Sequence, residues 1–226
     1  MLDLLPRNVL FSIESHIHQR VADAEYGFQF GEADEDTLTG ALGQMLLTRP
    51  QDDWDMQNNR QFQWSFTYRK VRGRGPNAPE KTIGADGIFQ IEVSDENGKM
   101  LRQKGLLFQA KIASKPGSSR KLRDQAELLS QFKRAAILIQ YSRHGYSAVP
   151  IDQMVQENQT ATRAKERILR PLADVLASDF LHCRIGQREL SYDPQRECLV
   201  GHGNLDGLSF DDEAHVVTVH IQQFPM

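Results

Sequence analysis

The sequence is poor in cysteine and has no long apolar run. Only two cysteines, Cys183 and Cys198, occur among 226 residues, too few for a disulfide framework, and this fits a reducing compartment. No apolar window of about 18 residues is present, and the N-terminus lacks the basic start and apolar stretch of a signal peptide. We therefore expect a cytoplasmic protein without a membrane partner.

Positive charge is not in excess either. The chain has 27 Lys and Arg against 30 Asp and Glu, for a net charge of -3. Nucleic-acid binding would therefore depend on local basic patches rather than on bulk charge. Hydrophobic residues make up 39% and charged residues 25% of the chain, which is typical of a folded globular protein. No linker divides the chain, so we predict a single domain over residues 1–226.

Strong metal-binding spacings are also missing. His182, Cys183, Cys198 and His202 contain no CxxC or HxxxH pair, and structural zinc sites are recognised by such pairs. We interpret the cysteines as small buried residues rather than as zinc ligands.

Two helices are predicted in the N-terminal third. Apolar residues recur at every fourth position from Val9, which predicts a helix over about residues 6–21. A second periodic stretch follows Asp34, and acidic residues gather at its start, where the helix dipole favours negative charge. This helix should end near residue 48, because Pro50 disfavours helical geometry at the residue before it.

The middle of the chain changes to the alternating pattern of β-strands. The predicted elements are strands 62–69, 83–93 and 105–113, a helix over 118–132, and strands 136–141 and 145–149. This order predicts an α/β domain with a mixed sheet flanked by helices, in which the first three strands form an antiparallel meander and a crossover leads to a further strand. Beyond residue 150, we predict a helix over 161–177 and short strands near 183–185, 197–200 and 215–221 that complete or flank the sheet.

A small group of polar residues stands where strands should be apolar. Asp86 lies at a strand start with glycine beside it, and strand alternation puts Gln109 and Lys111 on one face. A lysine in an apolar run needs a partner, because burying an unpaired ammonium is costly. Asp86 on the neighbouring strand would supply that partner. We therefore expect Asp86, Gln109 and Lys111 to converge at one end of adjacent strands.

This pattern resembles the PD-(D/E)xK nuclease superfamily, which has the restriction-endonuclease-like fold. The closest likeness is to the Mrr-like subgroup, in which Gln replaces the second acidic residue, as in Gln109-x-Lys111 here. The family also places a Glu on the helix before the meander, and Glu35 fills this position. The resemblance covers about residues 32–150, the predicted nuclease core, and leaves 151–226 as a C-terminal helix and strands.

The resemblance implies a Mg²⁺- or Mn²⁺-dependent deoxyribonuclease. Asp86, the Gln109 carbonyl oxygen and Glu35 would bind the metal, and Lys111 would orient or deprotonate the attacking water and stabilise charge on the phosphate. It further implies a role in bacterial restriction or anti-phage defence. The small size of the chain makes a homodimer, or a partner subunit that supplies recognition or activation, an expected assembly.

The choice of helix carboxylate stays open between Glu35 and Asp36. Glu35 shares a helix face with Leu38 and Leu42, whereas Asp36 shares a face with Gly40. A carboxylate on the apolar face is the better functional candidate, and we favour Glu35.

Basic residues border the predicted site and could contact phosphates. These candidates are Arg72, Arg74, Lys115, Arg120 and Lys121. The alternative is that they lie on solvated loops.

Two further interpretations stay open. Asp86 and Lys111 could form an ordinary cross-strand ion pair beside a solvated Gln109, and the chain could be a catalytically inactive module that binds nucleic acid or protein. The residues themselves do not distinguish DNA from RNA, and only the resemblance favours DNA.

Overall fold

The computed structural model describes residues 5–31, 34–71, 82–113, 129, 131–156, 169–201, 206–210 and 213–225. The helices are α1 (Arg7–Tyr26), α2 (Phe28–Gly31), α3 (Glu35–Leu46), the 3₁₀ turn η2 (Lys133–Ala135), α5 (Ile151–Gln156), α7 (Leu172–Asp174) and the π-helical segment η3 (Val175–Phe180). The strands are β1 (Thr48–Asp55), β2 (Arg60–Val71), β3 (Thr82–Ile83), β4 (Gly87–Ser94), β5 (Met100–Ile112), β6 (Ala136–Ser142), β7 (Gly145–Pro150), β8 (Arg170–Pro171), β9 (Gln187–Arg188), β10 (Ser191–Asp193), β11 (Cys198–Val200), β12 (Ser209–Phe210) and β13 (Ala214–Pro225). In this described part of the chain, none of the helices is both long enough and apolar enough to cross a membrane.

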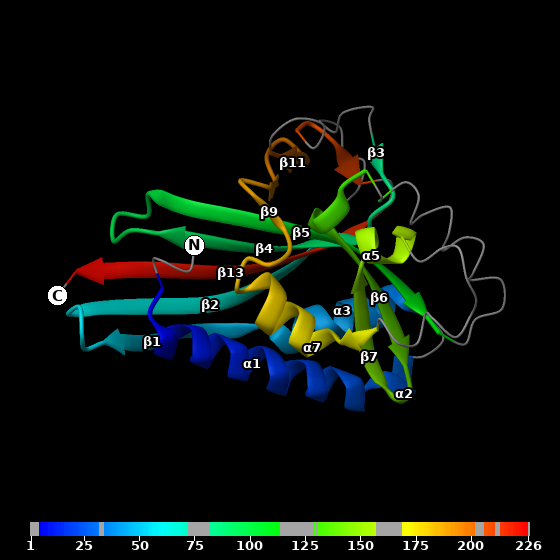
Figure 1. Ribbon diagram of the computed structural model, residues 1–226, viewed down its shortest axis with the longest axis horizontal. Helices are drawn as coiled ribbons and strands as arrows, with labels where there is room; N and C mark the ends of the chain where they lie inside the picture. Colours follow the sequence, from blue (N-terminus) through cyan, green and yellow to red (C-terminus); the bar gives the residue numbers. More distant parts are fainter. Residues whose placement is uncertain are drawn as a thin grey trace.

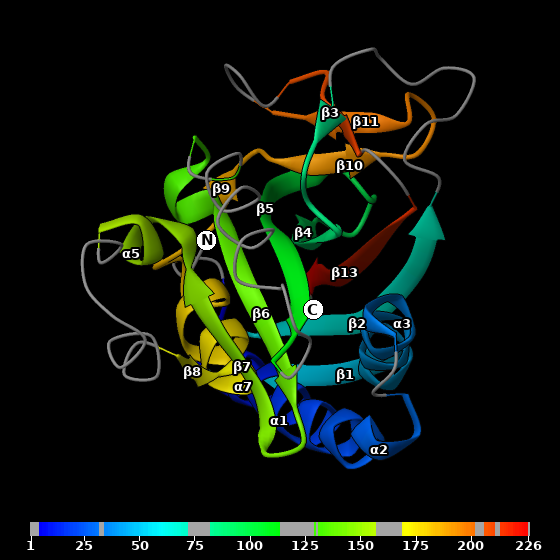
Figure 2. The ribbon, with the colours of Figure 1, turned by 90° about the vertical axis from the view of Figure 1, so that its right-hand side faces the viewer.

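The fold is α/β, with one mixed sheet of mostly antiparallel strands. Among the described strands the order is β1-β2-β13-β4-β5-β6-β7-β8, and β9 pairs with β5. Only the β13–β4 and β5–β6 neighbours in this sheet are parallel. Helices α1, α3 and α7 with η3 lie against one face of the sheet, and the short β10–β11 pair lies on the other side (Figures 1 and 2).

Strand β13 changes the predicted strand order. It lies between β2 and β4, antiparallel to the first and parallel to the second, so the expected meander of three neighbouring strands is wrong. Only β4 and β5 are adjacent as predicted. The physical reason is visible in β13 itself: Val216 is buried in the core on one face and Val217 in the core on the other. A strand covered on both faces belongs in the interior of a sheet.

Most N-terminal elements match the sequence predictions. The first helix extends to Tyr26, and α3 begins directly after Asp34, whose side chain caps the helix by accepting from the backbone N–H groups of Asp36 and Thr37. Strand β1 was not predicted. The strand expected near residues 183–185 is also wrong, because Cys183 lies in a turn with φ +62°. Most of the predicted helix over 118–132, and residues 161–168 of the later one, lie outside the described residues.

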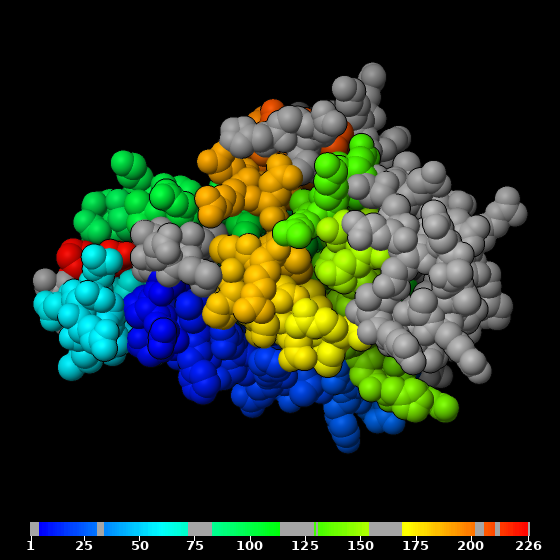
Figure 3. Space-filling model, in the orientation of Figure 1, coloured from blue at the N-terminus to red at the C-terminus, as the bar shows by residue number. Residues whose placement is uncertain are grey.

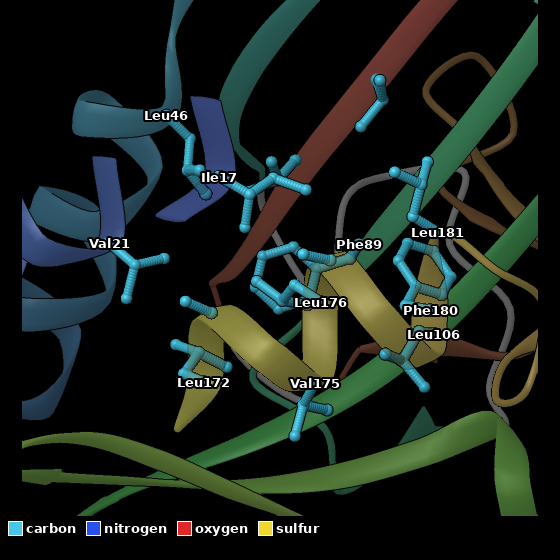
Figure 4. Close-up of a cluster of buried hydrophobic side chains, with 14 of the residues drawn as sticks. Ile17, Val21, Leu46, Phe89, Leu106, Leu172, Val175, Leu176, Phe180 and Leu181 are labelled. Carbon is cyan, nitrogen blue, oxygen red and sulfur yellow. The ribbon is translucent and has the colours of Figure 1, made fainter. Parts of the chain in front are cut away.

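A large apolar core holds the central strands in register. Leu176 and Phe180 of η3 pack with Phe89 of β4 and Leu106 of β5 between the helices and the sheet (Figure 4). Burying one such side chain contributes about 1.5–3 kcal/mol to stability. At the surface, α1 (blue) lies beside the yellow and gold segment that contains α7 and η3 (Figure 3). This packing fixes the ends of β4 and β5, where the candidate site lies.

Candidate active site

The backbone around Asp86 is fixed by the two strands on either side. Its N–H donates to the Phe108 carbonyl at 2.8 Å, and its own carbonyl accepts from the N–H of His215 at 2.9 Å. The next residue must be small: a Cβ on Gly87 would lie 2.1 Å from the His215 carbonyl oxygen and 2.6 Å from the Phe108 ring. The glycine beside Asp86 therefore permits the close approach of β13 and β5.

Asp86 and Gln109 are in direct contact. Gln109 Nε2 donates to Asp86 Oδ2 at 2.6 Å, and the Ala110 N–H donates to the same oxygen at 2.7 Å. Gln109 is only 1% exposed, and within the described residues its Oε1 has no hydrogen-bond partner. An unsatisfied buried acceptor costs about 1–3 kcal/mol. This oxygen thus marks a position suited to a positively charged or hydrogen-donating partner.

Lys111 and Glu35 form a second contact pair. Lys111 Nζ lies 3.2 Å from Glu35 Oε2, and the Ile112 N–H donates to Glu35 Oε1 at 3.2 Å. Both side chains are largely shielded, with 14% of Lys111 and 27% of Glu35 exposed. The ion-pair partner of Lys111 is therefore Glu35 of helix α3, not Asp86 of the neighbouring strand.

The electrostatics of Asp86 reflect its poor solvation. Burial raises the pKa of this carboxyl above its usual range. Hydrogen bonds from Ala110 and Gln109 and the charge of Lys111 oppose the shift, and the charge of Glu35 adds to it. Because the ionised form of Asp86 is poorly stabilised, a positive charge placed beside it would lower its free energy.

Asp36 belongs to a separate network on the neighbouring side of α3. His215 Nε2 lies 2.9 Å from Asp36 Oδ1, and Lys70 donates to Asp36 Oδ2 at 2.7 Å. His215 Nδ1 is 2.9 Å from the hydroxyl of Tyr68. Burial alone would raise the pKa of Asp36, but the contacts with Lys70 and His215 lower it below its usual range. Burial lowers the pKa of His215, although Asp36 opposes this.

Sequence reasoning missed this network, although one signal was present. The ring of Tyr68 packs against α3 so closely that a Cβ on Gly43 would lie 2.3 Å from a ring carbon. The same ring stacks on His215, with 5.9 Å between the two ring centres. The glycines on the Asp36 face of the helix therefore provide room for an aromatic ring. A glycine face on an amphipathic helix could have indicated close packing there, but not which residue packs against it.

One cavity of about 370 Å³ joins the two networks. Its lining residues are mostly acidic: Asp34, Glu35, Asp36, Thr39, Asp86, Glu213 and His215. Gln109 and Lys111 are not part of this lining, but each contacts a carboxylate that is, Asp86 and Glu35 respectively. Within the described residues, no group of three or more His, Cys, Asp or Glu side chains is arranged to hold a metal ion.

The predicted phosphate-binding residues cannot be placed in this geometry. Arg72, Arg74, Lys115, Arg120 and Lys121 all lie outside the described residues. Lys70, which is described, is held by Asp36 and by Glu213 at 2.8 Å.

Comparisons with protein-family models, curated proteins and solved structures find no match to this chain. The resemblance to the PD-(D/E)xK superfamily therefore stays a prediction from the motif.

Proposed function

We propose that this protein is a metal-dependent deoxyribonuclease that hydrolyses phosphodiester bonds, with Gln109 in the place of the second PD-(D/E)xK acid. One observation carries the proposal. Asp86, Gln109, Lys111 and Glu35, which come from separate parts of the chain, form two adjacent contact pairs, and both carboxylates line the same cavity. In metal-assisted phosphodiester hydrolysis, carboxylate and amide oxygens can hold the cation and an amine can stabilise the charge on the phosphate.

The residues fit a hard divalent cation. Mg²⁺ and Mn²⁺ prefer oxygen ligands, which Asp86, Gln109 and Glu35 would provide. The unpartnered buried Oε1 of Gln109 and the raised pKa of Asp86 both favour an added positive charge at this position. When bound, the cation would offset charge on the phosphate and make water a better nucleophile.

Lys111 and Glu35 would act together on the water and the phosphate. Glu35 holds the amine of Lys111 through a 3.2 Å contact, so the ammonium is oriented rather than free in solvent. An oriented N–H donor can hold an attacking water or stabilise the negative charge that develops on the phosphate. Gln109 would keep Asp86 in place through its short hydrogen bond.

The choice of DNA as substrate, and of restriction or anti-phage defence as the biological role, depends on the motif resemblance. So does the expected homodimer or partner subunit. The acidic cavity itself favours cations, so contacts to the DNA backbone would come from the basic residues that flank β2 and β5 in the sequence.

The direct test is cleavage of supercoiled plasmid DNA in Mg²⁺ or Mn²⁺. We expect cleavage to stop in EDTA and to fall by about 10²-fold or more in Lys111→Ala. Lys99→Ala is the matched control, because Lys99 lies on the turn at the opposite end of the β4–β5 hairpin, and this variant should cleave as the wild type does. Cleavage that persists both in EDTA and in Lys111→Ala contradicts the proposal.

A second candidate is a catalytically inactive binding module, and one observation favours it. Lys111 is already paired with Glu35, and Asp86 Oδ2 already accepts two N–H groups, so neither Lys111 nor Asp86 Oδ2 needs a substrate as a partner. A module of this kind would retard duplex DNA on a native gel in EDTA, and it would not cleave DNA in Mg²⁺ or in Mn²⁺. Thermal stabilisation by Mg²⁺ that Asp86→Asn abolishes would favour the nuclease instead.

A further inference from the structure

Strand β5 carries a second lysine, Lys104, in an unusual environment. This residue is 1% exposed. Its Nζ donates to the Phe180 carbonyl, lies 3.3 Å from Cys183 Sγ and sits 4.4 Å from the centre of the Phe180 ring. Among the described residues, no carboxylate makes an ion pair with it.

The surroundings of Lys104 shift its amine toward the neutral form. Burial lowers the pKa of Lys104, and the positive charge of Arg188 lowers it further, while Cys183 opposes the change. A buried lysine of this kind is present as the neutral amine, which can accept a proton or act as a nucleophile, in a larger fraction than a solvated lysine. The amine and the thiol are therefore two nucleophiles held in contact.

Cys183 can be reached by small solutes. It is partly exposed and lines a cavity of about 660 Å³ together with Arg102, Arg188 and other residues of β5 and the segment after η3. That segment belongs to the gold surface in Figure 3. The other cysteine, Cys198, is only 2% exposed. The two thiols therefore differ both in access and in the presence of a neighbouring amine.

We propose that Cys183 and Lys104 form a peroxide-responsive modification site, in which oxidised Cys183 condenses with Lys104 to a sulfenamide cross-link. In the first step the Lys104 amine accepts the thiol proton, and the thiolate attacks one oxygen of hydrogen peroxide. The O–O bond breaks, and the leaving hydroxide takes the proton from Lys104, giving Cys183 sulfenic acid and water.

In the second step the lone pair of Lys104 Nζ attacks the sulfenic sulfur. An S–N bond forms, the S–O bond breaks, and the hydroxide leaves as water with a proton from the amine. Overall, one thiol, one amine and one hydrogen peroxide give one sulfenamide and two waters. The sulfur is oxidised by two electrons and the peroxide is reduced by two.

The test is peptide mapping by mass spectrometry of the folded protein after hydrogen peroxide treatment. We expect a cross-link between the peptides that contain Lys104 and Cys183, with a net loss of two hydrogens, that dithiothreitol reverses. Cys198 should react at least about tenfold more slowly. Wild type that oxidises at Cys183 without forming this cross-link would overturn the proposal, and this experiment needs no variant.

Two substitutions test the part played by the amine. Lys104→Gln keeps a donor for the Phe180 carbonyl but removes the base and nucleophile, so we expect no cross-link and oxidation of Cys183 about tenfold slower. Arg102→Gln, on the same cavity, is the matched control and should behave as wild type. Oxidation of Cys183 at the wild-type rate in folded Lys104→Gln would overturn the assignment of Lys104 as the base. The readout is mass rather than cleavage, so it is independent of the proposed nuclease activity.

Discussion

Lys104 and Lys111 lie on the same strand and have opposite surroundings. Lys111, at the end of β5, lies 3.2 Å from the Glu35 carboxylate and keeps part of its side chain exposed. Lys104, within the strand, is almost fully buried and contacts a carbonyl, a thiol and an aromatic ring. A lysine in an apolar strand therefore has no single environment. The groups that face it decide whether it is held in an ion pair, as Lys111 is, or is buried against a carbonyl, a thiol and a ring that leave its pKa lowered, as Lys104 is.

The difference arises from the helical segment that reaches each lysine. At the end of β5, the first turn of α3 brings Glu35 to the lysine, whereas in the middle of β5 the π-helical segment η3 brings only the Phe180 carbonyl and its ring. Breaking each environment separately should therefore have different consequences.

The largest effect should follow from removing the carboxylate that distinguishes Lys111. Glu35→Gln removes both the partner of Lys111 and one proposed metal ligand, so we expect plasmid cleavage to fall about 10²-fold or more. The neighbouring substitution Asp36→Asn keeps an acceptor for His215, so we expect plasmid cleavage by this variant to fall less than about tenfold. Equal losses in the two variants would show that Asp36, not Glu35 alone, serves the reaction.

The next effect concerns the pH dependence of cation binding. Because the pKa of Asp86 is raised, protons compete with the metal for this carboxylate at a higher pH than for an ordinary aspartate. The Mg²⁺ concentration for half-maximal cleavage should therefore rise as the pH falls, by up to about tenfold per pH unit below that pKa. A half-maximal concentration that does not change as the pH falls toward the ordinary pKa range of an aspartate would contradict a ligand role for Asp86.

Asp86→Asn should stabilise the metal-free protein. Between the ordinary and the raised pKa, the folded state holds the proton more tightly than the unfolded state, so stability falls as the pH rises through this window. Above the raised pKa the full cost of the buried charge is present, and the neutral amide of Asn removes this cost while its oxygen still accepts from the Ala110 N–H. We expect the melting temperature to rise by about 2–4 °C. A lower melting temperature in metal-free buffer would indicate that Asp86 is a net stabilising residue.

The smallest effect should come from Lys104, and it has the opposite pH dependence. Its pKa is lowered by burial, so between that pKa and its ordinary value the unfolded state binds more protons, and stability rises with pH. The difference in unfolding free energy between wild type and Lys104→Gln should therefore shift in favour of wild type from about pH 7 to pH 10. Urea titrations at each pH measure this difference. A difference that does not change with pH would contradict the lowered pKa of Lys104.

Local patterns predicted much of the fold. The spacing of Val9, Ile13 and Ile17 identified α1, and the apolar runs identified β6 and β7 closely; β5 was identified too, but it begins at Met100, earlier than predicted. Strand β1 escaped prediction because its sequence is mostly exposed and polar, so it has no apolar alternation to detect. The position of β13 could not be predicted, because strand order depends on contacts between segments far apart in sequence.

The candidate site, like the fold, was predicted from the sequence only in part. The sequence by itself determined which residues are candidates for the site: an aspartate beside a glycine, and an amide and a lysine on one strand face, follow from the residue order and from the two-residue period of a strand. Only the tertiary structure decided their partners, pairing Lys111 with Glu35, Asp36 with His215, and Lys104 with Cys183. The physical reason is that hydrogen bonds and ion pairs act over a few ångströms. Which groups come that close is set by how whole helices and strands pack, and this information is spread over the entire chain.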